Sequence, residues 1–344
     1  MRPQIRSVVI ATLLVVSFVG AVAPVGAQSG TDDAVECSFP VSMPDATGAN
    51  VTVEERPERI VVLQPSAAQT VWELDAENRV VGAPVVSYTE YLDGIEEKEN
   101  VLNADEFSVN QEAVVAIEAD LVLAPNIVPD ETITSLREAD QTVFKFGFGN
   151  SLAFVADKTE QTGRLIGSCG EAAETNDQYW DRIEAVESGT DGYEAPRVLY
   201  YTDGFGAGSG TFIDEIITTA GGTNVAAENG VEGYGELNAE ALVEWDPEVI
   251  LVSDTGPGIP ETDAFNSTFA VRNDQVVAVN GNYISQPAPR IAIVLEDVAA
   301  ALEAAETAED TDPSEETTDD APGFGVVVAA TALVSIALLA RRRR

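Results

Sequence analysis

Short runs of branched apolar residues alternate with helical stretches through most of this chain, and this alternation constrains the fold more than any other feature. The runs RIVVL, RVVGAPV, ADLVLAP and TVFKF have the composition of strands buried in a parallel sheet. Helices are predicted between them at 66–74, 110–117 and 132–139. Because alternating strands and helices form sheets covered by helices, region 59–149 is predicted to be a doubly wound α/β lobe.

The same alternation resumes further along the chain and predicts a second lobe. Residues 151–187 are predicted to be helical, with a break at the sequence GSCG. The runs RVLYY, EVILV and QVVAVN then follow as strands, with helices predicted at 211–220, 239–245 and 290–305. The glycine-rich stretch 203–211 matches neither phosphate-binding motif and is predicted to be a flexible loop. The fold class is therefore α/β, with two lobes joined by helix, each large enough to have its own core.

Both ends of the chain have the composition of targeting segments. Residues 1–27 combine basic residues, an apolar stretch and the small residues Val25-Gly26-Ala27, an order typical of a secretory signal peptide. A retained N-terminal membrane helix is the alternative. At the other end Pro322-Gly323-Phe324 precedes an apolar stretch slightly shorter than the ~17–25 residues of a spanning helix. The final four arginines would hold that end in the cytoplasm.

The region before this segment is acidic and rich in threonine. Residues 306–321 have almost no apolar side chain, so they cannot bury a core and are predicted to form a disordered stalk. Residues 28–57 are predicted to be an entry segment with one strand at NVTVEE. Asn50 and Asn266 each begin a glycosylation sequon, which suits an exported surface.

The chain is strongly acidic, with 59 acidic and 18 basic residues and a net charge of −41. This charge repels nucleic acids and anionic lipid surfaces, so neither is an expected partner. High net charge with few aromatic residues can indicate disorder, but 45% of the residues are hydrophobic and cluster in strand-like runs. We interpret the acidity as adaptation to high salt, in which the repulsion is screened.

Histidine is absent, and only two cysteines are present. The absence of histidine excludes Ser-His-Asp and Cys-His catalysis, and two thiols alone cannot form a tetrahedral zinc site. No enzyme activity, cofactor or protein-held metal is therefore expected. In an exported chain Cys37 and Cys169 are predicted to form a disulfide, with two buried free thiols as the alternative.

Several stretches resemble a known family. RIVVLQPSAAQTVWEL, SYTEYL and SVNQEAVVAIEADLVLAP occur in the order found in substrate-binding proteins of ABC importers for cobalamin and ferric siderophores. GELNAEALVEWDPEVILV and NYISQPAPRIAIVLEDVAAAL continue the likeness, which covers 58–302. It implies two Rossmann-like lobes joined by a single helix, the helical-backbone fold of periplasmic binding proteins, with a ligand held between the lobes.

The resemblance also implies a function. The chain would be an extracellular, membrane-anchored solute-binding protein that delivers a metal chelate to an ABC permease and its ATPase. Cobalamin or another corrinoid is favoured, and a ferric siderophore is next. A cell-surface structural or adhesion protein that has kept the fold without transport is the alternative.

The C-terminal segment resembles a second known element, the tripartite PGF-type sorting signal of haloarchaea. In that family an archaeosortase cuts near the tripeptide and transfers the new C-terminus to a membrane lipid. The mature chain would then run from about Gln28 to about Pro322, anchored to the outer face of the cytoplasmic membrane.

Loops that follow the predicted strands supply the candidate ligand contacts. They are Gln64, Ser66, Tyr88, Tyr91 and Asn126 in the first lobe, and Phe205, Tyr234, Asn282 and Tyr283 in the second. Aromatic side chains suit a planar macrocycle or an aryl siderophore, although each could instead be a core or loop residue. Arg290 is also a candidate, because a cation at a helix start needs a partner. That partner is an anionic ligand group or, preferably, a structural carboxylate.

Glu112 and Glu240 occupy matching places in the two lobes. The resembled family uses one surface glutamate on each lobe to pair with arginines of the permease, so the resemblance implies this docking role for both.

The predicted segments divide the chain into seven parts. These are a signal peptide (1–27), an entry segment (28–57), an N-terminal α/β lobe (58–150), a connecting helical region (151–190), a C-terminal α/β lobe (191–305), a stalk (306–321) and a sorting signal with its membrane helix and basic tail (322–344).

Overall fold

The computed structural model describes residues 37–105, 107–190 and 195–309. The predicted signal peptide, the start of the entry segment, most of the stalk and the sorting signal lie outside these residues. The described chain forms two compact units. The first contains the residues up to Arg182 together with Asn282–Ala292, and the second contains Ile183–Gly281 and the residues from Ile293 onward.

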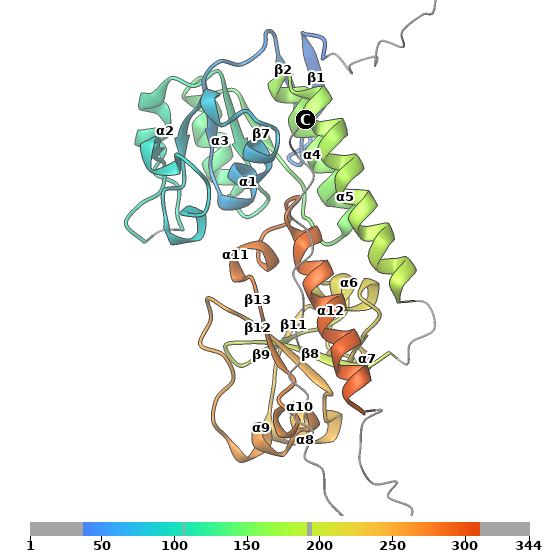
Figure 1. Ribbon diagram of the computed structural model, residues 1–344. Helices are drawn as coiled ribbons and strands as arrows, with labels where there is room; N and C mark the ends of the chain where they lie inside the picture. Colours follow the sequence, from blue (N-terminus) through green and yellow to red (C-terminus); the bar gives the residue numbers. More distant parts are fainter. Residues whose placement is uncertain (1–36, 106, 191–194, 310–344) are drawn as a thin grey trace, which may run out of the picture. The chain divides into compact units, whose positions relative to one another are not determined.

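The first unit, drawn mostly in blue and green in Figure 1, is built on a five-stranded parallel sheet with strand order β5-β4-β3-β6-β7. Its strands are β3 (Ile60–Val62), β4 (Val80–Ala83), β5 (Glu99–Asn100), β6 (Leu121–Ala124) and β7 (Val143–Lys145). Its helices are α1 (Pro65–Glu73), α2 (Gln111–Ile117), α3 (Asp130–Glu138), α4 (Leu152–Ile166) and the first part of α5 (Cys169–Gly189). Short 3₁₀ turns lie at Glu77–Arg79, Ser87–Thr89 and Ile95–Glu97. The strand order reverses between β3 and β6, as in dinucleotide-binding folds.

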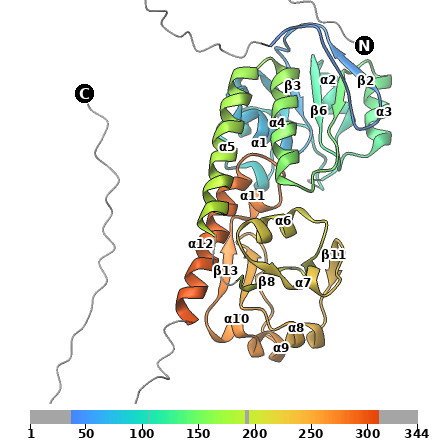
Figure 2. The same cartoon turned by 90° about the vertical axis from the view of Figure 1, so that its right-hand side faces the viewer.

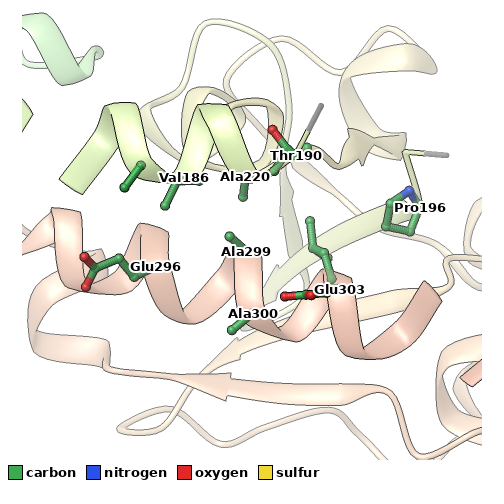
Figure 3. A pocket seen from close by; sticks show the side chains of 12 residues that line it. Val186, Thr190, Pro196, Ala220, Glu296, Ala299, Ala300 and Glu303 are labelled. Carbon is green, nitrogen blue, oxygen red and sulfur yellow. The ribbon is translucent and has the colours of Figure 1, made fainter. Parts of the chain in front are cut away.

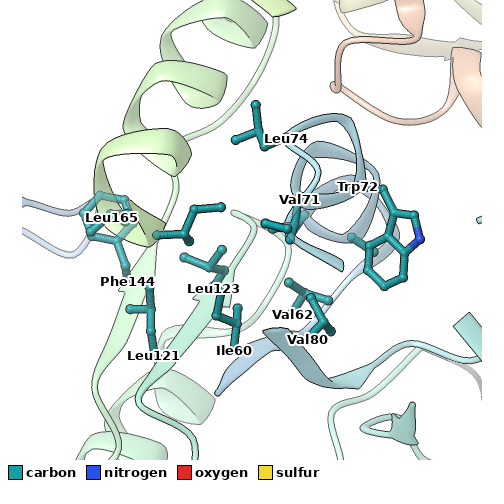
Figure 4. Close-up of a cluster of buried hydrophobic side chains, with 14 of the residues drawn as sticks. Ile60, Val62, Val71, Trp72, Leu74, Val80, Leu121, Leu123, Phe144 and Leu165 are labelled. Carbon is teal, nitrogen blue, oxygen red and sulfur yellow. The ribbon is translucent and has the colours of Figure 1, made fainter. Parts of the chain in front are cut away.

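Apolar side chains cover both faces of this sheet, which explains why its strands are almost continuously hydrophobic. Figure 4 shows one face, where Ile60, Val62, Leu121, Leu123 and Phe144 from the strands meet residues of α1 and α4. The opposite face packs against α2 and α3. Helices α4 and α5 lie side by side (Figure 2), and the chain turns between them at Gly167 with a φ of 74°.

The entry segment forms an antiparallel hairpin rather than the single strand predicted. Strand β1 (Val41–Pro44) pairs with β2 (Asn50–Val53), and every second residue is buried in the core of the first unit. The predicted disulfide between Cys37 and Cys169 is confirmed, with 5.4 Å between the two Cα atoms. The bridge joins the residues before the hairpin to the first residue of α5.

The second unit contains a six-stranded sheet with strand order β11-β9-β8-β12-β13, and β10 also pairs with β8. Its strands are β8 (Arg197–Thr202), β9 (Phe205–Ala207), β10 (Thr223–Asn224), β11 (Tyr234–Glu236), β12 (Val249–Ser253) and β13 (Val276–Val279). Its helices are the end of α5, α6 (Phe212–Thr219), α7 (Val225–Glu228), α8 (Ala239–Trp245), α9 (Asp263–Ser267), α10 (Phe269–Arg272) and most of α12 (Ile291–Glu309). Strands β8, β10, β12 and β13 are parallel, whereas β9 and β11 extend the sheet antiparallel.

Both units confirm the predicted α/β fold class. Helix α5 runs from the first unit into the second, and the chain changes unit again before Asn282 and after Ala292, so α5 is one of three connections. Three details differ from the prediction. The stretch 203–211 is not merely a flexible loop, because its centre forms β9. The segment Asn282–Ala292, which includes most of the short helix α11 (Gly281–Ile284), packs in the first unit rather than in the C-terminal lobe. Helix α12 continues to Glu309, four residues into the predicted stalk.

Within the described ranges, no helix is both long enough and apolar enough to span a membrane. The predicted C-terminal membrane helix lies outside those ranges.

Candidate functional site

The carboxyl ends of β3 and β6 flank the point at which the strand order of the first unit reverses, where open α/β sheets bind ligands. Gln64 follows β3 and is 7% exposed, and its Nε2 donates to the carbonyl of Phe107 at 3.0 Å. Ser66 is also buried, and its carbonyl accepts from Lys158 Nζ. Asn126, after β6, is half-buried. Gln64 and Ser66 therefore hold the loops of this edge in place, and Asn126 is the more accessible of the three.

Four exposed apolar side chains distinguish this edge. Tyr88 follows β4, Phe107 follows β5, Ile127 follows β6 and Phe148 follows β7. We call this set the apolar edge. The last three are 68%, 66% and 70% exposed, and the ring centroids of Tyr88 and Phe107 lie 6.2 Å apart. Because exposed apolar side chains at a ligand-binding edge indicate an interaction surface, the apolar edge is the strongest candidate site in the first unit.

Of these four residues only Tyr88 was predicted from the sequence as a ligand contact; Phe107, Ile127 and Phe148 were not. A usable signal was present, because each of the three lies in a connection that leaves the carboxyl end of a strand. Phe148 was easily overlooked, since it follows Phe144 and Phe146 in the run FKFGF and both of those rings are buried.

A polar network joins the segment 282–292 to the rest of the first unit. The Tyr91 hydroxyl accepts from Gln69 Nε2 at 2.8 Å and donates to Gln286 Oε1 at 3.0 Å. Burial raises the pKa of Tyr91 to about 12, so the hydroxyl keeps its proton. The Tyr91 and Tyr283 rings meet edge to face, with centroids 5.3 Å apart. The structure thus brings these two predicted residues together; Asn282, beside Tyr283, is half-buried.

Arg290 pairs with a structural carboxylate, as the sequence analysis preferred. Its Nε donates to Glu73 Oε1 at 2.6 Å, and its guanidinium lies over the rings of Tyr91 and Tyr283. Burial is the largest single influence on the pKa of Arg290 and lowers it. The hydrogen bond to Glu73 and the charge of Glu73, together with Tyr283, outweigh burial, so the pKa is raised overall. The charge of Arg290, a predicted ligand contact, is therefore neutralised by Glu73.

The second unit exposes two of the predicted aromatic residues. Phe205 begins β9 directly beyond the carboxyl end of β8, where it pairs with Thr202, and is 38% exposed. Tyr234 begins β11 opposite Ala207 and is 56% exposed. Both side chains are accessible to a ligand at this part of the second sheet.

Two cavities lie away from these residues. One of about 280 Å³ in the second unit lies between the end of α5, α12 and the residues before β8 (Figure 3). Small side chains such as Ala220, Ala299 and Ala300 line it, with Glu296 and Glu303 among the other residues. Another of about 600 Å³ in the first unit lies beside Cys37 and Cys169. Neither contains a predicted ligand contact. No cluster of three or more acidic or cysteine side chains able to hold a metal occurs within the described ranges.

Glu112 and Glu240 occupy equivalent positions in the two units. Each is exposed in the first turn of a seven-residue helix, α2 or α8. An asparagine caps each helix, and its side chain accepts from the backbone N–H of Ala113 or Ala241. The match seen in the sequence is therefore a match of local structure.

The C-terminal end of each of these two helices is held by an arginine side chain. Arg59 donates to the carbonyls of Ile117 and Glu118 at the end of α2, and Arg197 donates to that of Asp246 at the end of α8. Each arginine stands at the start of a strand beside its helix, so the helix is fixed to the sheet through its last carbonyls.

Both predicted glycosylation sites have exposed asparagines. Asn50 begins β2 and Asn266 lies in α9. The sequon threonine at 268 is fully buried, and its hydroxyl donates to the carbonyl of Phe265. Glycosylation at both positions stays a prediction.

The comparisons with known proteins define the class. The chain belongs to the periplasmic binding protein family, whose model matches residues 60–283. This is a family of solute-binding proteins rather than enzymes. Residues 321–343 match the PGF-CTERM motif, which together with the family indicates an exported, surface-anchored protein.

The chain is 38% identical to a cobalamin-binding protein of Halobacterium salinarum, over 96% of this chain and 98% of the relative. Its fold is similar to that of the periplasmic vitamin B12-binding protein of Vibrio cholerae, with a TM-score of 0.63, 23% identity and coverage of 73% and 98% of the two chains. It is also similar to that of a periplasmic haem-binding protein from Roseiflexus, with a TM-score of 0.65, 24% identity and coverage of 72% and 99%.

Proposed function

We propose that this protein captures a corrinoid, with cobalamin favoured over a ferric siderophore, and delivers it to an ABC importer. The observation that carries the proposal is the apolar edge, where the connections after four successive strands each expose an apolar side chain. Flat aromatic and aliphatic side chains give a macrocycle a large contact area at little cost in side-chain entropy. The name of the Halobacterium salinarum relative supports a corrinoid over other chelates.

The remaining predicted contacts belong to the same proposal. Tyr88 and Asn126 lie at the carboxyl edge of the first unit, and Phe205 and Tyr234 are exposed in the second. Gln64, Ser66, Tyr91, Tyr283 and Arg290 have partners within the first unit, so we assign them the role of positioning the ligand-contacting side chains. The half-buried Asn282 stays a proposed ligand contact. None of the relatives named above favours the alternative of a structural or adhesion protein.

Titration of the purified protein with cyanocobalamin in molar salt tests this function. Phe107→Ala and Phe148→Ala should each weaken binding by about tenfold, because each removes an aromatic contact. Trp180→Ala is the matched control, since Trp180 is an exposed aromatic residue on α5 outside the apolar edge. The corrinoid function is wrong if the wild-type protein binds ferric hydroxamates and not cobalamin, and both candidate ligands are wrong if it binds neither.

We further propose that an archaeosortase cuts the chain near Pro322 and attaches it through a membrane lipid to the outer face of the cytoplasmic membrane. The matched PGF-CTERM motif supports this proposal. The intact mass of the mature protein should then lack both termini and include a lipid. A mature protein that retains Arg341–Arg344 would show that the C-terminal segment is an ordinary membrane anchor.

A further inference from the structure

We infer that this protein selects uncharged or cationic chelates, so that corrinoids with amidated side chains bind and corrinoids with free carboxylates are rejected. The inference rests on the proposed function and adds to it the charge of the ligand. It follows from the position of every basic side chain in the described chain and from what each of them contacts.

Three basic side chains lie near the carboxyl edge of the first unit, and each is occupied. Lys145 ends β7, is 9% exposed and pairs with Asp130. Lys158 is 2% exposed, and its Nζ donates to two backbone carbonyls at 3.0 Å. Arg290 pairs with Glu73. A ligand carboxylate at this edge would have to share one of these cations with the carboxylate or carbonyls that it already contacts.

Most other basic residues lie at the amino-terminal edge of the sheet in their own unit, away from its carboxyl edge. Each of them precedes a strand or lies in the last turn of a helix. In a parallel α/β unit these positions are at the edge of the sheet opposite the carboxyl edge. The residues are Arg56, Arg59, Arg79, Lys98, Arg137, Arg164, Arg197 and Arg272. Arg182, on α5, has a partner of its own. In the described part of the chain, the carboxyl edges therefore offer no unoccupied cation.

The apolar edge instead has an acidic neighbour. Asp105, two residues before Phe107, accepts bonds from the backbone N–H groups of Phe107 and Ser108 and from the Ser108 hydroxyl. These bonds lower the pKa of Asp105, so the carboxylate stays ionised.

A ligand carboxylate buried here would lose its hydration without gaining a cationic partner, which is strongly unfavourable. Molar salt does not remove this cost. It screens charges beyond about 3 Å and so suppresses long-range repulsion, but desolvation acts at contact. Uncharged amide side chains on the same ring avoid most of the cost.

Two corrinoids with the same ring test the inference. Cobinamide carries amide side chains, whereas cobyrinic acid carries free carboxylates. In molar salt the protein should bind cobyrinic acid at least about 100-fold more weakly than cobinamide. Equal affinities would overturn the inference and leave the corrinoid function standing. Failure of both to bind, together with failure of cobalamin, would refute the corrinoid function and the inference with it.

A variant that releases a cation gives a second test. Asp130→Asn removes the partner of Lys145 and should strengthen binding of cobyrinic acid by about tenfold, with little change for cobinamide. Glu131→Gln is the matched control, because it removes the same charge from the next residue of α3, which forms no ion pair with Lys145. If both variants strengthen the binding of cobyrinic acid equally, the net charge of the protein alone determines the affinity for this ligand, and the inference is wrong.

Discussion

At the scale of single residues, Lys158 is an ionisable side chain that the fold buries without an acidic partner among the described residues. It lies on α4, and its Nζ binds the carbonyls of Ser66 and Pro287, with the Phe146 ring 5.7 Å away. The bonds connect α4 to the start of α1 and to the segment 282–292. Burial lowers the pKa of Lys158 from 10.5 to about 7.

This shift predicts a dependence of stability on pH. Between pH ~7 and ~10 the unfolded chain binds more protons than the folded chain, so the free energy of unfolding rises with pH in this range. Below pH ~7 both states are protonated and the burial penalty is present in full. Lys158→Met should flatten the rise, as measured by guanidinium unfolding from pH ~7 to ~9.5. Parallel pH profiles for the two proteins would contradict the prediction.

At the scale of elements, the bridge between Cys37 and Cys169 ties the β1–β2 hairpin to α5. The hairpin contributes Val41, Met43, Val51 and Val53 to the core of the first unit, but its two strands pair only with each other. The bridge closes a loop with a sequence separation of 132 residues between the hairpin's N-terminal side and α5. The bridge therefore fixes the short hairpin to the long helix α5.

Removing the bridge should lower the stability of the first unit. In the chain-entropy model a loop of this length is worth up to about 5 kcal/mol, because the bridge restricts the unfolded chain. The double variant Cys37→Ser and Cys169→Ser should lose a large part of that amount in equilibrium unfolding. Ser38→Ala, which changes the adjacent residue and keeps the bridge, should remain close to the wild-type protein. A double variant as stable as the wild type would show that packing alone holds the hairpin.

At the scale of the whole molecule, the two units repeat one local design. In each, an arginine at a strand start fixes the end of a short asparagine-capped helix, and a glutamate is exposed in the first turn of that helix. We propose that these glutamates, Glu112 and Glu240, pair with arginines of the permease. Surface charge pairs of this kind determine register more than affinity.

Uptake measurements with variants test this docking role. Glu112→Ala and Glu240→Ala should each reduce transport while ligand affinity stays unchanged, and the double variant should nearly abolish transport. Glu131→Ala and Glu228→Ala are matched controls, since both are exposed glutamates in helices of the two units. Unchanged uptake in the double variant would show that Glu112 and Glu240 are ordinary members of an acidic surface.

The sequence by itself determined the α/β class, the alternation of strands and helices, and the matching positions of Glu112 and Glu240. These features depend on the local pattern of apolar residues and on helix capping, which neighbouring residues decide. The disulfide was also predictable, because only two cysteines are present.

Only the tertiary structure decided which side chains are exposed and which cations are occupied. Phe144 and Phe148 belong to one short run, yet the first is buried and the second is 70% exposed. Arg290 and Glu73 pair across 217 positions in the sequence. The short strands β9 and β11 exist only because they pair with each other and with β8. Such contacts join residues far apart in the chain, so they cannot be predicted from the local pattern of apolar and polar residues.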